Sequence, residues 1–103
     1  MSRAVLWSTT AKAELEGIAR YIARTSPLYA ERLIDRILAH ADQAAIFPEA
    51  GRMVPEGRRK GVREVFEGSY RIIYLVQTSR IDVLAVVHSR QQLTWPEESE
   101  PPG

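Results

Sequence analysis

Two stretches of helical periodicity lie next to each other in this sequence, and they constrain the fold more than any other feature. Apolar residues recur at helical spacing from residue 10 to 24 and again from 27 to 47. Ser26 is suited to cap the second helix, and Pro27 suits its first position, where a missing N–H costs nothing. Because so few residues connect the two helices, we predict that they form an antiparallel hairpin.

Strands are predicted on both sides of this hairpin. A short apolar run at 4–7 precedes it, and a glycine-containing loop over 49–61 follows it. Beyond the loop the periodicity becomes two, and Gly68-Ser69 is typical of a tight hairpin turn. We expect an α+β fold with the order β-α-α-β-β-β, in which the helical hairpin packs on a small antiparallel sheet. The last three predicted strands are 62–67, 70–77 and 81–88.

The chain is short enough for a single domain. We assign residues 1–93 to it and expect the acidic, proline-rich residues 94–103 to form a disordered tail. With no cysteine and only two histidines, far apart, neither a metal site nor a cofactor is expected. No apolar run approaches the ~20 residues of a membrane span, and the N-terminus lacks the pattern of a signal peptide. We therefore expect a cytoplasmic protein with no membrane partner.

Counting back from the expected turns places several reactive side chains together. If Gly68-Ser69 is one turn, Phe66 faces Arg71, and if Ser79-Arg80 is the next, Arg71 faces His88. Since side chains alternate between faces, Glu64, Arg71 and His88 are predicted to share one face. Arg71 could then stabilise a phosphate in the transition state of RNA cleavage, while His88 or Glu64 moves protons. The alternative is a structural ion pair between Glu64 and Arg71, with a histidine beside it.

A basic segment lies in and after the loop. Twelve of the fourteen basic residues of the chain are arginines, which bind phosphate and carboxylate groups in a bidentate manner. This segment could contact nucleic acid or an acidic partner, or it could simply be a solvated loop. Its residues are Arg52, Arg58, Arg59, Lys60 and Arg63, of which the last four are the candidates for contact with nucleic acid or the target.

The order of several motifs over residues 4–93 resembles the RelE/ParE superfamily of toxins. These motifs are Ser8-Thr9-Thr10-Ala11, the run from Phe47 to Arg52 leading to Val62-Arg63-Glu64, Tyr70 to Tyr74, and Val83 to Arg90. The resemblance implies the toxin of a type II toxin–antitoxin system. It implies a cognate antitoxin as partner, whose C-terminal segment wraps the toxin, and contact with operator DNA only through that antitoxin.

The superfamily has two branches with different targets. RelE-like members cleave mRNA on the ribosome, and ParE-like members poison DNA gyrase. The resemblance places Arg71 where RelE-like enzymes keep a catalytic arginine, and His88 and Arg90 near the end of the last strand, where further active-site residues occur; Glu64 would complete the site. However, no tyrosine follows Arg90, and few lysines are present. We therefore favour the ParE-like branch. A superfamily member that only binds its antitoxin is a further alternative.

The antitoxin is expected to bind an apolar groove, because two helices on so small a sheet should leave one partly open. Trp7, Tyr21 and Tyr29 are the candidate groove residues, with arginines on the rim suited to an acidic antitoxin segment.

Overall fold

The computed structural model describes residues 2–55 and 60–91, so the predicted tail at 94–103 lies outside the described residues. The predicted order of elements is confirmed, with a short 3-10 helix and one more short strand inside the predicted loop. The elements are β1 (Ala4–Trp7), α1 (Thr9–Ala23), α2 (Pro27–Ile46), the 3-10 helix η1 (Pro48–Ala50), β2 (Arg52–Met53), β3 (Val62–Glu67), β4 (Tyr70–Val76) and β5 (Arg80–His88).

Two serines set the start of the helices, as the sequence indicates. The Ser8 hydroxyl accepts a hydrogen bond from the backbone N–H of Ala11 at 3.0 Å, and that of Ser26 accepts one from Tyr29 at 3.1 Å. Each bond satisfies an N–H that has no partner within the helix. The second helix ends at Ile46, before Pro48, because a proline disfavours helical geometry in the residue that precedes it.

The sheet has five strands in the order β1-β5-β4-β3-β2. The pairs formed by β2, β3, β4 and β5 are antiparallel, but β1 pairs with β5 in parallel. The sheet is therefore mixed. The purely antiparallel sheet expected from the sequence is wrong in this respect. The pattern of the four-residue strand β1 does not indicate in which direction it pairs. The strand β2 has only two residues, which is too short to show a pattern in the sequence.

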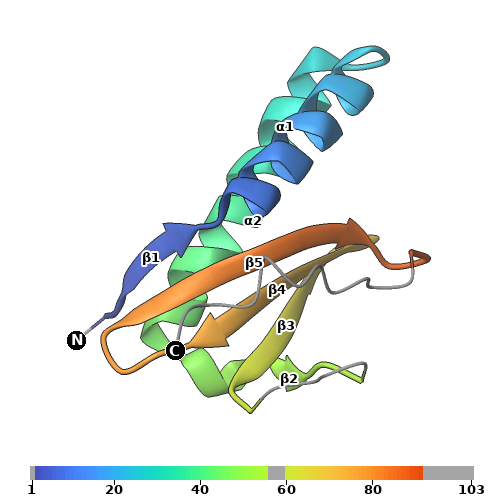
Figure 1. Ribbon diagram of the computed structural model, residues 1–103. Helices are drawn as coiled ribbons and strands as arrows, with labels where there is room; N and C mark the ends of the chain where they lie inside the picture. Colours follow the sequence, from blue (N-terminus) through green and yellow to red (C-terminus); the bar gives the residue numbers. More distant parts are fainter. Residues whose placement is uncertain (1, 56–59, 92–103) are drawn as a thin grey trace.

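The helical hairpin packs on one face of the sheet and extends beyond it (Figure 1). The main core lies between the helices and this face, where Ile37, Ile72, Ile81 and Val83 have no exposed surface. A second apolar cluster, which includes Ile73 and Leu75, lies on the opposite face, because side chains alternate along β4. Within the described residues, no helix is long and apolar enough to cross a membrane.

A β-bulge between β4 and β5 changes the register from the predicted one. Near the turn, Ile81 pairs with Val76, whereas the predicted turn would pair it with Thr78. A shift of two residues leaves every side chain on the face predicted for it. Between Ile73 and Tyr74 the register then shifts by one, because Leu84 is an extra residue in β5. A shift of one residue reverses the face of every side chain beyond it. The bulge therefore determines on which side the end of β5 places its side chains.

The segment before β2 is tightly packed at Gly51. A Cβ at this position would overlap the hydroxyl of Tyr74 and lie 2.8 Å from the carbonyl oxygen of Glu64. We expect Gly51→Ala to lower the free energy of unfolding by about 1–3 kcal/mol, measured by urea denaturation. The control is Gly17→Ala in α1, where a Cβ meets nothing within 4 Å; it should raise stability by about 1 kcal/mol. Equal stability of the two variants would contradict this packing.

Candidate functional site

A buried carboxylate links two arginines on the sheet face opposite the helices. The Oε1 atom of Glu64 accepts a hydrogen bond from Nε of Arg71 at 2.6 Å, and Oε2 accepts one from Nε of Arg52 at 2.6 Å. Glu64 is 1% exposed and Arg71 is 5% exposed. A buried carboxylate is costly unless its charge is compensated, so Glu64 requires its arginine partners.

Arg52 lies on the solvent side of Glu64. Its guanidinium lies over the ring of Phe66, 5.0 Å from the ring centroid, while more than half of its side chain remains exposed. Phe66 pairs with Arg71 across the sheet, as the turn at Gly68-Ser69 predicts. The two arginines thus approach Glu64 from the strands on either side of β3, and Nε of Arg71 is occupied by the Glu64 carboxylate.

The predicted neighbourhood of His88 is wrong. Arg71 pairs with Val87, and His88 pairs with Tyr70, so His88 lies on the helix side of the sheet. The bulge at Leu84 causes this difference, because it reverses the faces beyond it. There the ring of His88 stands edge-on to that of Tyr70, with a centroid distance of 5.5 Å. Glu64 and Arg71 are brought together as predicted, but His88 does not join them.

Arg90 lies just beyond β5 with His88. Its backbone N–H donates to Nδ1 of the His88 ring at 3.1 Å, and the residue itself is exposed. In the neutral ring, the acceptor role of Nδ1 places the proton on Nε2. The half-buried His88 ring is therefore linked to the backbone of Arg90 at the strand end, and this ring lies on the other side of the sheet from Arg71.

The predicted basic segment is only partly described. Arg58 and Arg59 lie outside the described residues. Lys60 is exposed, whereas Arg63 donates from Nη1 to the carbonyl oxygen of Gly51 at 2.7 Å and so ties β3 to the segment before β2. Arg63 thus has a structural partner, whereas Lys60 is exposed.

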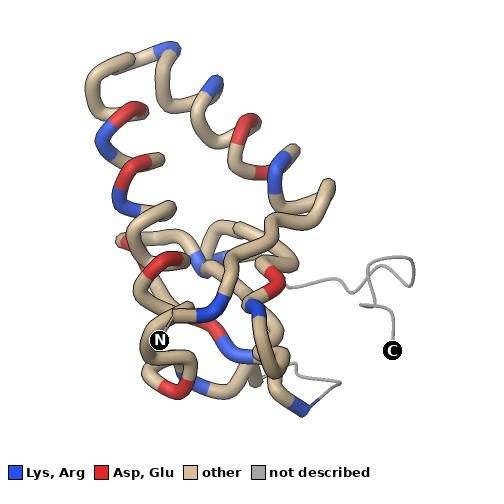
Figure 2. Tube along the Cα trace, turned by 90° about the vertical axis from the view of Figure 1, so that its left-hand side faces the viewer, with Lys and Arg blue, Asp and Glu red and all other residues tan. Residues whose placement is uncertain are grey.

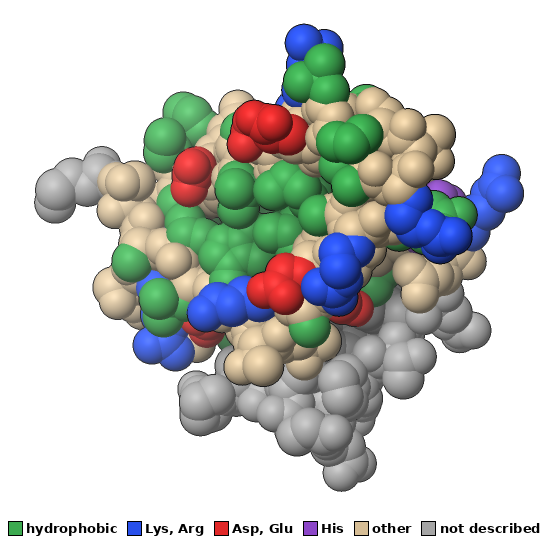
Figure 3. All heavy atoms as spheres, turned by 90° about the horizontal axis from the view of Figure 1, so that it is seen from above, with side chains coloured by type: hydrophobic (Ala, Val, Ile, Leu, Met, Phe, Trp, Pro, Cys, Tyr) green, Lys and Arg blue, Asp and Glu red, His purple; other side chains and the backbone are tan. Residues whose placement is uncertain are grey.

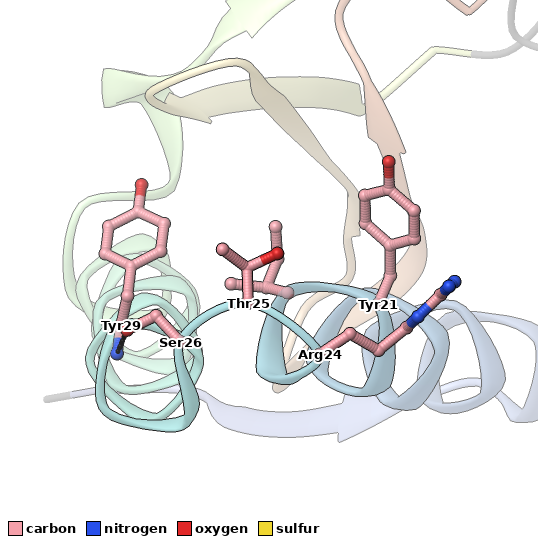
Figure 4. Close-up of a pocket in the computed structure, with 6 residues that line it drawn as sticks. Tyr21, Arg24, Thr25, Ser26 and Tyr29 are labelled. Atoms are coloured by element: carbon pink, nitrogen blue, oxygen red, sulfur yellow. Dashed lines mark hydrogen bonds between the residues drawn. The ribbon is translucent and has the colours of Figure 1, made fainter.

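The tip of the helical hairpin carries a cleft of about 590 Å³. Tyr21 on α1 and Tyr29 on α2 stand on either side of it and point the same way, with Thr25 and Ser26 between them (Figure 4). The guanidinium of Arg24 lies 6.0 Å from the ring centroid of Tyr21. Two of the three predicted groove residues, Tyr21 and Tyr29, thus lie around one cleft.

The third predicted groove residue, Trp7, lies elsewhere. It is half-buried on β1 and packs against the main core beneath the helices. Charged residues recur along both helices of the hairpin (Figure 2). Seen from above, hydrophobic side chains gather in a hollow with acidic and basic side chains around it (Figure 3). The helical hairpin itself exposes Tyr21, Leu28 and Tyr29 among these charged residues, a combination that is typical of a protein-binding site.

A polar contact that the sequence does not reveal joins α2 to β3. Glu67 accepts a hydrogen bond from Nε of Arg36 at 3.0 Å, and its other oxygen lies 2.9 Å from Nε2 of His40. Both helix residues are one turn apart on the same face, which is the only sequence signal for a shared partner. Within residues 2–55 and 60–91, no group of three or more His, Cys, Asp and Glu side chains is arranged to hold a metal ion.

Known proteins resemble this chain over most of its length. Residues 5–93 match the family described as the ParE toxin of the type II toxin–antitoxin system parDE. A candidate toxin of Sinorhizobium fredii, Y4kP, is 34% identical over 94 residues, which cover 90% of this chain and 93% of that protein. Toxin RelE2 of Caulobacter vibrioides is 33% identical over 85 residues, covering 82% and 93% of the two chains.

Two solved structures share the fold. The chromosomal ParDE system of P. aeruginosa matches with a TM-score of 0.68 and 19% identity, over 84% of this chain and 96% of that chain. The RelBE2 toxin–antitoxin complex of Mycobacterium tuberculosis matches with a TM-score of 0.60 and 21% identity, over 85% and 99%. At these identities the likeness establishes the fold and not the target.

The contacts of Glu67 should make stability depend on pH. Burial alone would raise the pKa of Glu67, but the hydrogen bonds from His40 and Arg36 outweigh it and lower the pKa below its ordinary value of 4.5. A carboxyl group with a lowered folded pKa stabilises the fold above its unfolded pKa, and this stabilisation is lost as the pH falls through the folded value.

We therefore expect Glu67→Gln to cost about 1 kcal/mol of unfolding free energy at neutral pH and progressively less below 4.5. Urea denaturation of both proteins across the pH range measures this difference. Glu16→Gln is the control, because its i,i+4 pair with Arg20 is exposed and should contribute only a few tenths of a kcal/mol. A cost that is unchanged far below 4.5 would rule out this linkage.

Proposed function

Because this chain belongs to the ParE toxin family of type II toxin–antitoxin systems, we propose that it inhibits DNA gyrase by binding it and does not cleave RNA. The observation that carries this proposal is the position of Arg71. Its guanidinium donates to Glu64 at 2.6 Å and is almost entirely buried. An arginine that stabilises a reacting phosphate must reach the phosphate oxygens, and a buried partner carboxylate opposes that role.

The remaining residues of the predicted nuclease site support the same proposal. Arg71 and His88 lie on opposite faces of the sheet, so a phosphate held at one cannot exchange protons with the other. Arg90 lies with His88 and not with Arg71. Glu64, the other candidate proton carrier, accepts hydrogen bonds on both of its oxygens. In this arrangement Glu64 and Arg71 stabilise the sheet.

We also propose that a cognate antitoxin neutralises the toxin at the hairpin tip. The cleft between Tyr21 and Tyr29 offers two exposed rings, which are favourable anchors in protein interfaces. Arg24 lies over the first ring and Arg36 lies 5.8 Å from the centroid of the second. Two cations beside apolar rings fit an antitoxin segment that combines acidic and apolar residues. Trp7, which packs in the core, would contribute only through its exposed edge.

Lys60 and the neighbouring basic segment are candidates for the contact with the target. Gyrase and antitoxin act where the chromosome lies, so the proposed site of action is the cytoplasm. Operator DNA would be contacted only through the antitoxin.

The test is to induce the toxin in a bacterium without antitoxin and to follow plasmid supercoiling and mRNA integrity in the same cells. We expect supercoiling to be lost while mRNA stays intact, and purified toxin to inhibit gyrase in vitro until antitoxin is added. A toxin prepared with its antitoxin is the matched control. Cuts in translated mRNA with normal supercoiling would overturn the proposal and would indicate a ribosome-dependent endoribonuclease.

A further inference from the structure

A second groove lies between α1 and the ends of β4 and β5, on the helix side of the sheet. Its volume is about 320 Å³, and it adjoins the tip cleft, because Tyr21 lines both. We call it the α1–β5 groove. The residues that matter here are Glu14, Gly17, Tyr21, Tyr70, Val86 and His88.

Gly17 indicates that the floor of this groove is kept open. It lies in the middle of α1, where glycine is the least favourable residue after proline. A Cβ at this position would meet nothing within 4 Å, so packing within the protein does not require glycine there. Glycine does permit another molecule to approach a backbone closely. An occupant of the groove would account for this residue.

Glu14 places a carboxylate in the same groove. Its Oε1 atom accepts a hydrogen bond from the backbone N–H of Val86 at 2.9 Å, beyond the point where β1 stops pairing with β5. Burial raises the pKa of Glu14, and the bond from Val86 opposes that shift only in part. Among the described residues that line the groove there is no lysine or arginine. No basic side chain in the described lining of the groove therefore compensates the charge of the Glu14 carboxylate. A positively charged ligand could do so.

The walls of the groove are aromatic. Tyr21 lies on one side, and Tyr70 and His88 lie together on the other, with their rings in edge-to-face contact. Aromatic faces attract cations, and a guanidinium is planar, so it can stack on a ring while it pairs with a carboxylate. A hydrophobic side chain would fill the same space, but it would cover the half-buried Glu14 carboxylate without supplying an opposite charge.

We propose that the α1–β5 groove binds an arginine side chain of the antitoxin, with its guanidinium paired to Glu14 between the rings of Tyr21 and Tyr70. The proposal rests on the proposed function, since it assumes an antitoxin. It adds that one antitoxin segment carries acidic residues for the hairpin tip and an arginine for the adjoining groove. The order of charges along that segment would then determine which antitoxin fits this toxin.

The first test uses the toxin alone with a small probe, N-acetyl-L-arginine methylamide, in an NMR titration that follows the backbone amides of Gly17 and Val86. We expect both signals to shift in a saturable way. The citrulline analogue has nearly the same shape without the charge, and it should bind about tenfold more weakly. Equal binding of the two probes, or no shift at Gly17 and Val86, would overturn the proposal.

Two variants separate binding from folding. Glu14→Gln removes the charge but keeps an oxygen for Val86, and Glu16→Gln removes an exposed carboxylate from the same helix as the matched control. Gly17→Leu adds a side chain whose Cβ meets nothing within 4 Å, and because leucine forms helices far better than glycine, the melting temperature should not fall. We expect Glu14→Gln to weaken arginine binding about tenfold, Gly17→Leu to abolish it, and Glu16→Gln to leave it unchanged.

The same variants, mixed with purified antitoxin, distinguish this inference from the proposed function. If Glu14→Gln binds the antitoxin as tightly as the unaltered toxin does, the arginine site is wrong and the antitoxin partnership stands. If the unaltered toxin binds no antitoxin, the partnership itself fails. The loss of supercoiling in cells that express the toxin alone is measured without the probe and without the antitoxin, so that result is independent of both.

Discussion

The buried Glu64 carboxylate is the interaction on which the far face of the sheet depends. Its two oxygens are taken by Arg52 from β2 and Arg71 from β4, each at 2.6 Å, so one side chain joins three neighbouring strands. Removing one partner of such a pair leaves an uncompensated charge and costs about 3–5 kcal/mol. The strand β2 has only two residues, and its bond to Glu64 helps to hold it on the sheet.

The β-bulge at Leu84 separates two groups of side chains that would otherwise share a face. Before the bulge, Ile81 and Val83 belong to the core beneath the helices; beyond it, Val86 and His88 take the helix side and Val87 the other. Arg71 consequently lies on the far face with the Glu64 carboxylate, while His88 lines the α1–β5 groove. One extra residue thus turns the end of β5 toward the helical hairpin and its proposed partner.

Local signals in the sequence predict most of the fold and part of the site. Ser8, Ser26 and Pro48 bound the helices, and the turn at Gly68-Ser69 gives the pairing of Phe66 with Arg71. The bulge has no comparable signal, because residues 83–87 are all apolar and show no alternation that would mark an extra residue. The contact of Glu14 with Val86 is equally hidden, since an acidic residue in a helix normally indicates a solvated face.

We propose that Arg71 stabilises the sheet and takes no part in chemistry. The most direct measurement is the toxicity of the double variant Glu64→Leu/Arg71→Met, together with its melting temperature. Apolar residues of similar volume often replace a buried ion pair at little cost, and the exposed Arg52 can turn to water. We expect a folded variant that still arrests growth. A variant that folds with the same melting temperature but has lost all toxicity would contradict it.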